Sequence, residues 1–198
     1  MADRLKIALR TTMKQIRSRL TVPYRLTAAK QVIHQIKSLE QYRNAKRIAL
    51  YCAINGEVDL AALWNTAPMQ GKFCYFPSLN EDKTLSFLPA TPATAFKTNH
   101  YNIPEPDVSR ELALPIEQLD LIIIPLVAFD SECTRLGMGA GYYDRTLEHH
   151  KKGLFIGVAY SFQHMHFITP NTWDVPLDAV ITPKKIYWRP QLDESSPS

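Results

Sequence analysis

Apolar residues near the start of the chain recur every three or four positions, which predicts an amphipathic helix over residues 3–20. The side chains expected on its buried face are Leu5, Leu9, Met13, Ile16 and Leu20. A second helix is predicted over residues 23–39, where Pro23 suits the first turn and Ile33 and Ile36 face inward. We therefore expect two helices ahead of the rest of the fold.

After this segment the pattern changes to short apolar runs that predict strands. The runs are residues 47–52, 72–76, 84–88, 119–125, 154–160 and 179–182. Helical stretches at 58–65 and 141–150 lie between them, and strands apolar on both faces are typical of a parallel or mixed sheet covered by helices. The sequence thus predicts an α/β fold, a three-layer sandwich with a central, mainly parallel sheet, preceded by two N-terminal helices.

The predicted sandwich forms a single domain over residues 1–192, followed by a short disordered tail at 193–198. The proline-rich segment 88–115 is expected to run over the surface of this domain. A length of 198 residues with 45% hydrophobic and 21% charged residues suits one globular core.

The composition also excludes several classes of protein. The longest apolar run, residues 121–129, is too short to cross a bilayer, and the basic first segment lacks the apolar centre of a secretory signal. The three cysteines match neither a disulfide framework nor a zinc site, so reduced thiols are expected. We expect a cytoplasmic protein without a membrane partner.

Positive charge is concentrated at one end of the sequence. Residues 1–47 hold 12 Lys and Arg against two acids, whereas residues 48–198 hold 11 against 17. Within the first helix the cations form a basic stripe: Lys6, Arg10, Lys14 and Arg17. The stripe is either solvated or kept for an anion, and charge alone does not choose among nucleic acid, an anionic membrane and a nucleotide.

Three of the seven glycines lie within five residues, at Gly137, Gly139 and Gly141. They follow an apolar run and precede a predicted helix, an arrangement in which backbone N–H groups approach an anion, although an ordinary tight turn is the alternative. Arg135 precedes the glycines and Asp144 lies in the first turn of the helix. An arginine, free N–H groups and a carboxylate so close together suit a nucleoside triphosphate with magnesium.

Residues 119–130 (LDLIIIPLVAFD) and 135–144 (RLGMGAGYYD) together resemble the signature of the 5-formyltetrahydrofolate cyclo-ligase family. The second of these blocks is highly specific. Other blocks that match in order are residues 6–10, 56–58, 71–72, 101–106, 156–160 and 173–180, so the resemblance covers nearly the whole chain.

The resemblance implies an enzyme that closes 5-formyltetrahydrofolate to 5,10-methenyltetrahydrofolate, with ATP as co-substrate, Mg²⁺ required, and ADP and phosphate released. ATP would phosphorylate the formyl oxygen, N10 would attack the activated carbon, and phosphate would depart. The implied partners are a reduced formylfolate and ATP, without nucleic acid, and we expect a monomer. The protein would contribute positioning and charge stabilisation.

The family's functional positions fall on particular residues here. ATP is expected at Lys6, Arg10, Arg135, Leu136, Gly137, Met138, Gly139, Ala140, Gly141, Tyr142 and Tyr143. The folate is expected at Cys52, Glu57, Tyr101, Met138, Gly139, Ala140, Gly141 and Tyr142. Arg135 and Glu57 are the expected catalytic residues, and Asp144 and Asp174 the expected Mg²⁺ ligands. Lys14 and Arg17 are left as solvated cations.

Each of these residues also has a purely structural interpretation. Asp144 and Glu57 can be acids at helix starts, and Asp174 can be a turn residue. Cys52 can be a core thiol, and Tyr101 a packed loop aromatic.

The sequence departs from the family pattern at three positions. Cys133 stands where the family usually has glycine, and a side chain there disfavours positive φ by about 1–2 kcal/mol, so we expect the turn to bend differently. Ala140 stands where many members carry lysine or glycine, and Met138 is neutral where some relatives have a cation, which predicts weaker ATP binding.

Two other functions remain open from the sequence. A degenerate family member could bind RNA or another polyanion through residues 1–47, although the two aromatic residues there, Tyr24 and Tyr42, are few for a nucleic-acid face. A sugar-phosphate isomerase-like enzyme would share the phosphate-binding architecture without needing Lys6, Arg10 and the two carboxylates.

Overall fold

A seven-stranded sheet forms the centre of the computed structural model, which describes residues 2–150 and 152–190. In spatial order its strands are β11 (Ile186–Trp188), β10 (Ala179–Ile181), β9 (Leu154–Val158), β6 (Leu121–Pro125), β1 (Arg47–Ala49), β2 (Phe73–Leu79) and β3 (Leu85–Pro89). The five inner strands are mutually parallel, and β3 and β11 pair antiparallel at the two edges. The prediction of a mainly parallel sheet is confirmed.

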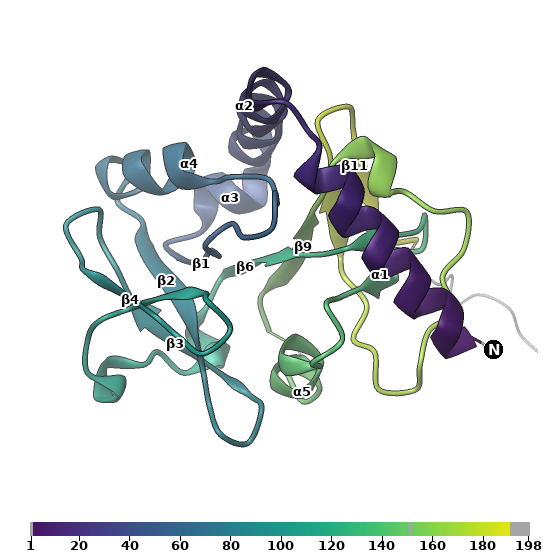
Figure 1. The fold of residues 1–198 in the computed structure, drawn as a ribbon. Helices are drawn as coiled ribbons and strands as arrows, with labels where there is room; N and C mark the ends of the chain where they lie inside the picture. The colour runs from purple at the N-terminus through teal and green to yellow at the C-terminus, as the bar shows by residue number, and fades with distance from the viewer. Residues whose placement is uncertain (1, 151, 191–198) are drawn as a thin grey trace, which may run out of the picture.

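Helices cover both faces of this sheet (Figure 1). They are α2 (Val22–Ser38), α3 (Glu40–Asn44) and α4 (Ala61–Thr66) on one face, and α5 (Tyr142–Leu147) on the other. Strand β6 shows why both are needed, since Leu121 and Ile123 join the hydrophobic cluster under α2–α4 while Ile122 and Ile124 join the cluster under α5. The three-layer prediction is therefore confirmed, with α5 shorter than expected.

Two small hairpins were not predicted. One joins β7 (Ala128–Phe129) to β8 (Arg135–Leu136), and the other joins β4 (Phe96–Thr98) to β5 (Pro104–Pro106) inside the proline-rich segment. The buried Glu105 carboxylate ties the second hairpin to β2, accepting from Ser78 Oγ at 2.7 Å and from the Leu79 N–H at 2.9 Å. The segment is therefore a fixed part of the fold.

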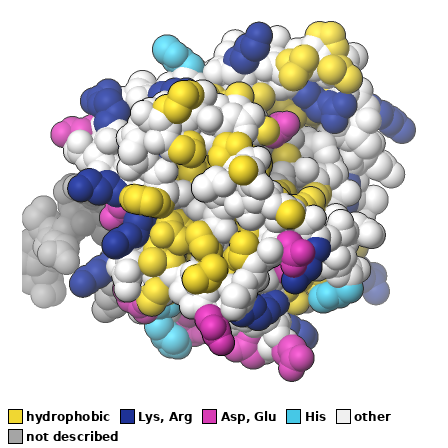
Figure 2. All heavy atoms as spheres, turned by 90° about the vertical axis from the view of Figure 1, so that its left-hand side faces the viewer, with side chains coloured by type: hydrophobic (Ala, Val, Ile, Leu, Met, Phe, Trp, Pro, Cys, Tyr) yellow, Lys and Arg dark blue, Asp and Glu magenta, His cyan; other side chains and the backbone are white. Residues whose placement is uncertain are grey.

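The β4–β5 hairpin and α4 lie on the face shown in Figure 2, where hydrophobic side chains gather in the middle and charged ones around them. Trp64, Phe76 and Phe96 pack edge to face, with ring centroids 5.0–5.5 Å apart. The remaining short helical turns are η1 (Pro68–Gln70), η2 (Arg110–Leu112), η3 (Ile116–Gln118) and η4 (Ser161–Gln163).

The first helix, α1 (Ala2–Ser18), buries only part of the face expected. Leu5 is 72% and Ile16 38% exposed, whereas Arg17 is only 1% exposed. Met13 packs with Leu136 in a small third cluster beside the β7–β8 hairpin. The predicted face is therefore confirmed at Met13, and at Leu9 and Leu20, which pack against the core, and it is wrong at Leu5 and Ile16. Arg17 joins the buried face because it finds partners for its charge inside the protein.

Within residues 2–150 and 152–190, no helix combines the length and the apolar character needed to cross a membrane. Cys52, Cys74 and Cys133 are free thiols, as expected. The predicted tail at 193–198 lies outside the described residues, and the domain boundary at 192 stays a prediction.

Candidate active site

The predicted site residues meet at the carboxyl ends of the parallel strands, where α/β proteins bind ligands. Glu57 follows β1, the glycine loop 137–141 follows β6 by way of the β7–β8 hairpin, and Asp174 lies between β9 and β10. Helix α1 lies alongside this edge (Figure 1). Four segments far apart in the sequence thus contribute to one region.

Arg10 contacts the glycine loop directly. Its Nε donates to the Gly137 carbonyl at 2.9 Å. Gly139 has φ of 104°, and a Cβ at that position would lie 3.3 Å from the Arg10 guanidinium carbon. Gly141 adopts φ of 74° at the start of α5, so a side chain at either glycine would be strained. The loop therefore needs these two glycines, and a cation lies against it as the sequence predicts.

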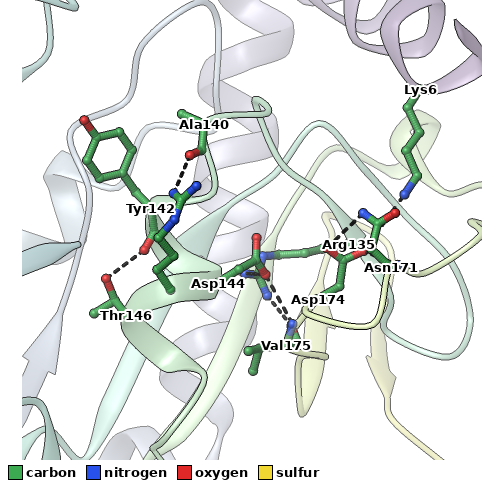
Figure 3. A network of polar contacts seen from close by, with 10 residues as sticks. Lys6, Arg135, Ala140, Tyr142, Asp144, Thr146, Asn171, Asp174 and Val175 are labelled. Atoms are coloured by element: carbon green, nitrogen blue, oxygen red, sulfur yellow. Dashed lines mark hydrogen bonds and ion pairs between the residues drawn. The ribbon is translucent and has the colours of Figure 1, made fainter. Parts of the chain in front are cut away.

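Arg135 is the centre of a polar network that joins β8, α5 and the segment before β10 (Figure 3). Its side chain is 4% exposed, its Nη2 lies 2.6 Å from Asp144 Oδ1, and its Nη1 donates to the Val175 carbonyl. The Val175 N–H donates to the same Asp144 oxygen at 3.2 Å. Burial lowers the pKa of Arg135, and the charges of Asp144 and Asp174 oppose that shift. Arg135 is thus held rigidly as a cation.

Asp174 is part of a turn and also lies close to Lys6 of α1. Its Oδ2 accepts from the Asn171 N–H at 2.8 Å, which is the turn role considered from the sequence, and it also lies 4.0 Å from Lys6 Nζ (Figure 3). Asp144, in the first turn of α5, uses Oδ1 for both of its hydrogen bonds.

This donor set suits Mg²⁺, which in nucleotide sites takes one or two carboxylates and completes its shell with phosphate oxygens and water. No group of three His, Cys, Asp or Glu side chains gathers anywhere in the described part of the chain. Asp144 and Asp174 could therefore hold the ion only together with a phosphate ligand.

Glu57 is buried, with its side chain 6% exposed. Its Oε2 accepts from the Ile54 N–H at 3.1 Å, and its Oε1 lies 3.7 Å from Arg17 Nη1. Burial raises the pKa of Glu57 to about 7, against the lowering effects of the Ile54 N–H and of Arg17. The expectation that Arg17 is solvated was wrong. Its position seven residues after Arg10, on the same helical face, is the signal that could have indicated the contact.

Tyr143 links the two halves of the site. Burial raises its pKa, the charge of Glu57 adds to that rise, and Arg135 opposes it, so the ring lies within the electrostatic reach of both expected catalytic residues. Cys52 also raises the pKa of Tyr143. Because burial raises the pKa of Cys52 itself to about 11, its thiol is protonated at neutral pH and contributes shape.

The remaining predicted contacts differ in exposure. Leu136 is buried beside Met13, and its carbonyl already accepts from the Val127 N–H at 2.8 Å, whereas Met138 is 39% exposed and Ala140 is exposed. Tyr101 is 53% exposed, and its ring lies edge to face with that of Tyr142 at 6.3 Å. The β4–β5 hairpin thus reaches the start of α5, which the sequence did not indicate.

Cys133 adopts φ of 58° in the turn before Arg135. This is the left-handed region that glycine favours, so the expected difference in bending is not found. The turn is held by the Asp130 carboxylate, which accepts from the N–H groups of Glu132 and Thr134 at 3.1 and 3.0 Å. Buried packing of the Cys133 side chain offsets the strain.

Two hollows lie near this region. One, of about 230 Å³, borders Arg135, Asp174 and Arg189. The other, of about 410 Å³, lies between β3 and α5 beside Arg145 and His150 and contains none of the predicted site residues. We therefore associate only the smaller one with the site.

Comparisons with known proteins agree with this geometry. Residues 2–183 match the model of the 5-formyltetrahydrofolate cyclo-ligase family. The chain is 39% identical over 173 residues to the 5-formyltetrahydrofolate cyclo-ligase of Haemophilus influenzae, covering 85% of this chain and 92% of that one. It is 34% identical over 179 residues to the enzyme of the same name from Escherichia coli strain K12, covering 88% and 98%.

A solved structure is similar over almost its whole length. The NMR structure of 5,10-methenyltetrahydrofolate synthetase from Aquifex aeolicus superposes with a TM-score of 0.83 at 35% identity, covering 98% of this chain and 97% of that one. Sequence, fold and the arrangement of the glycine loop lead to one conclusion: the chain belongs to the 5-formyltetrahydrofolate cyclo-ligase family and is an enzyme of that family.

Proposed function

We propose that this enzyme uses ATP and Mg²⁺ to close 5-formyltetrahydrofolate to 5,10-methenyltetrahydrofolate, releasing ADP and phosphate. The observation that carries the proposal is the meeting of Arg10, Arg135 and the glycine loop at the sheet edge that also holds Glu57. Cations and a glycine loop beside a buried carboxylate suit a triphosphate next to the neutral, hydrogen-bonding pterin of the folate.

In the proposed reaction the formyl oxygen attacks the γ-phosphorus of ATP, and the bond from that phosphorus to the ADP oxygen breaks. The N10 lone pair then attacks the activated formyl carbon, closing the ring. Loss of phosphate, with loss of the N10 proton, leaves the methenyl bridge. No protein nucleophile is required, so the enzyme's contribution is orientation and charge stabilisation.

Arg135 is assigned to the charge that develops on the transferred phosphoryl group. Its ion pair with Asp144 and its bond to the Val175 carbonyl fix the guanidinium before ATP arrives, so little reorganisation is needed during transfer. Lys6 and Arg10, which lie about one turn apart on one face of α1, are assigned to the other phosphates. Glu57 is assigned to the folate, where its carboxylate accepts N–H bonds.

Asp144 and Asp174 are the residues assigned to Mg²⁺. When bound, the ion would neutralise negative charge on the terminal phosphates of ATP. Met138 and Ala140 supply no positive charge to the loop, so we expect this enzyme to depend on Arg10 for ATP affinity.

The test is the absorbance of 5,10-methenyltetrahydrofolate formed by purified enzyme from 5-formyltetrahydrofolate, with ATP or Mg²⁺ omitted in turn. Absorbance should rise only when both are present. Arg10→Ala should raise KM for ATP on the order of tenfold, because it removes a charged hydrogen bond, whereas the matched control Lys14→Ala changes an exposed cation on the same helix. A rise without ATP, or equal KM values in both variants, would refute the assignment.

The alternative of a degenerate, polyanion-binding relative receives no support from the comparisons. Three of the cations that suggested it, Lys6, Arg10 and Arg17, are turned toward partners within the protein. The cytoplasmic location and the monomeric state stay predictions from the sequence.

A further inference from the structure

Arg17 is a fully buried cation to which neither the sequence nor the proposed reaction assigns a role. Its Nη1 donates to the Leu126 carbonyl at 3.3 Å and lies 3.7 Å from Glu57 Oε1. Its Nε and Nη2 are also buried, and within the described residues they have no hydrogen-bond partner. Burying a charge costs several kcal/mol unless an opposite charge compensates it, and Glu57 is the acid paired with it.

The backbone around this pair is packed too closely for the contact to be incidental. Gly56, next to Glu57, adopts φ of 71°, and a Cβ there would lie 2.9 Å from the Arg17 carbonyl oxygen. The loop after β1 therefore lies directly on the end of α1. This contact fixes the position of the Glu57 carboxylate relative to the helix that carries Arg10.

Arg17 is the cation that acts on Glu57. The titratable groups near that carboxylate are Arg17 of α1, Tyr51 after β1 and Tyr143 of α5, with Asp59 nearby along the chain. Tyr160, after β9, contacts the same residue at its backbone, where its hydroxyl donates to the Glu57 carbonyl at 3.5 Å. The tyrosines are neutral at physiological pH, because burial raises the pKa of each. The Tyr51 hydroxyl is also occupied, donating to the Val58 carbonyl at 2.6 Å. The Ile54 N–H and the charge of Arg17 are what favour ionised Glu57.

We propose that Arg17 is a positioning residue for folate recognition: by pairing with Glu57 it favours the ionised form of that carboxylate and orients it to accept N–H bonds from the reduced folate. The inference rests on the proposed role of Glu57. A protonated carboxyl would offer a donor in place of one of these acceptors, so loss of Arg17 would weaken folate binding near neutral pH.

The test compares Arg17→Gln, which keeps an amide donor for the Leu126 carbonyl and removes the charge, with Arg17→Lys, which keeps the charge. Lys14→Gln is the matched control on the same helix. Binding of 5-formyltetrahydrofolate without ATP is measured by calorimetry between pH 5.5 and 8.5, and KM for ATP is measured separately. In Arg17→Gln we expect folate affinity at pH 7 to fall on the order of tenfold and the acid-side midpoint to rise by about one pH unit, while KM for ATP is unchanged.

Arg17→Lys should keep the wild-type pH midpoint of folate binding and lose only about a few-fold in folate affinity. If Arg17 only anchors α1, the Gln variant would instead lose folate affinity equally at every pH and raise KM for ATP, because Arg10 lies on the same helix. That result, or unchanged folate binding, would overturn the proposal.

A second set of variants separates this inference from the proposed function. Arg17→Gln combined with Glu57→Gln removes both charges, a change that buried pairs often tolerate, so it remains measurable if Arg17→Gln alone does not fold. In the Glu57→Gln background, the further substitution Arg17→Gln should change folate affinity by less than about twofold. A further tenfold loss would show that Arg17 acts independently of Glu57. If Glu57→Gln binds folate with the affinity of the wild type, the role proposed for Glu57 is refuted, whatever Arg17 does.

Discussion

Replacing Asp144 with asparagine should destabilise the fold as well as lower activity. Its Oδ1 accepts a hydrogen bond from Arg135 Nη2 at 2.6 Å, and the Arg135 side chain is 4% exposed. Asparagine keeps the shape and an acceptor oxygen, so the substitution removes only the charge that balances a buried cation. Loss of one partner of a buried ion pair costs about 3–5 kcal/mol, and a hydrogen bond to a charged group contributes about 1.5–3 kcal/mol. Because Asp144 is 23% exposed and one acceptor remains, we expect a loss of about 2 kcal/mol.

For a chain of this length, 2 kcal/mol corresponds to a fall in Tm of about 4–8 °C, which thermal unfolding followed by circular dichroism resolves. Glu148→Gln is the matched control, because it removes an exposed carboxylate at the end of the same short helix. Its Tm should stay close to that of the wild type. An Asp144→Asn variant as stable as this control would refute the reasoning, since Arg135 would then not depend on Asp144 for its charge balance.

Three further predictions concern stability. Burial raises the pKa of Glu57 from 4.5 to about 7, so between these pH values the folded state holds a proton that the unfolded state has released. The free energy of unfolding should therefore fall by about 3 kcal/mol as pH rises from about 4.5 to about 7. Urea unfolding should show that this pH dependence is absent from Glu57→Gln, and an equal pH dependence in the variant and the wild type would show that Glu57 is not its source. Lys72→Met should cost about 3 kcal/mol or more in urea unfolding, because the buried ammonium donates to three carbonyls at 2.6–3.1 Å, whereas the exposed Lys46→Met should cost little. Equal losses of stability from the two substitutions would show that the three hydrogen bonds of Lys72 do not stabilise the fold. Gly56→Ala should lower Tm, since its methyl group would meet the Arg17 carbonyl at 2.9 Å, and a wild-type Tm would show that the loop moves freely.

The central sheet could be predicted because its strands carry their own signal. Residues 121–125 are apolar at every position before Pro125, and the structure gives each face of that strand a separate hydrophobic cluster. The glycine loop was also predictable, because the backbone at Gly139 and Gly141 takes φ values that other residues resist. In both cases the local sequence and the tertiary structure impose the same requirement.

The burial of Arg17 could not be predicted from the apolar periodicity of α1. Periodicity assigns apolar side chains to the interior, but Arg17 is buried because its acidic partner, Glu57, lies in a loop that follows a later strand. The pairing of Asp144 with Arg135 was hidden for a related reason. Both residues were recognised as parts of the site, yet nothing in the sequence showed that they neutralise each other.

The long-range contacts of α1 have a consequence for the order of folding. The bond from Arg10 to Gly137 spans 127 positions and that from Arg17 to Leu126 spans 109, so neither forms before the sheet has assembled. A 17-residue helix is marginal by itself in water, and Leu5 and Ile16 of α1 remain exposed. Helix α1 should therefore dock last and exchange its amide hydrogens faster than β6 at the centre of the sheet. Ligands that bind across α1 and the glycine loop would slow that exchange, coupling completion of the fold to occupancy of the site.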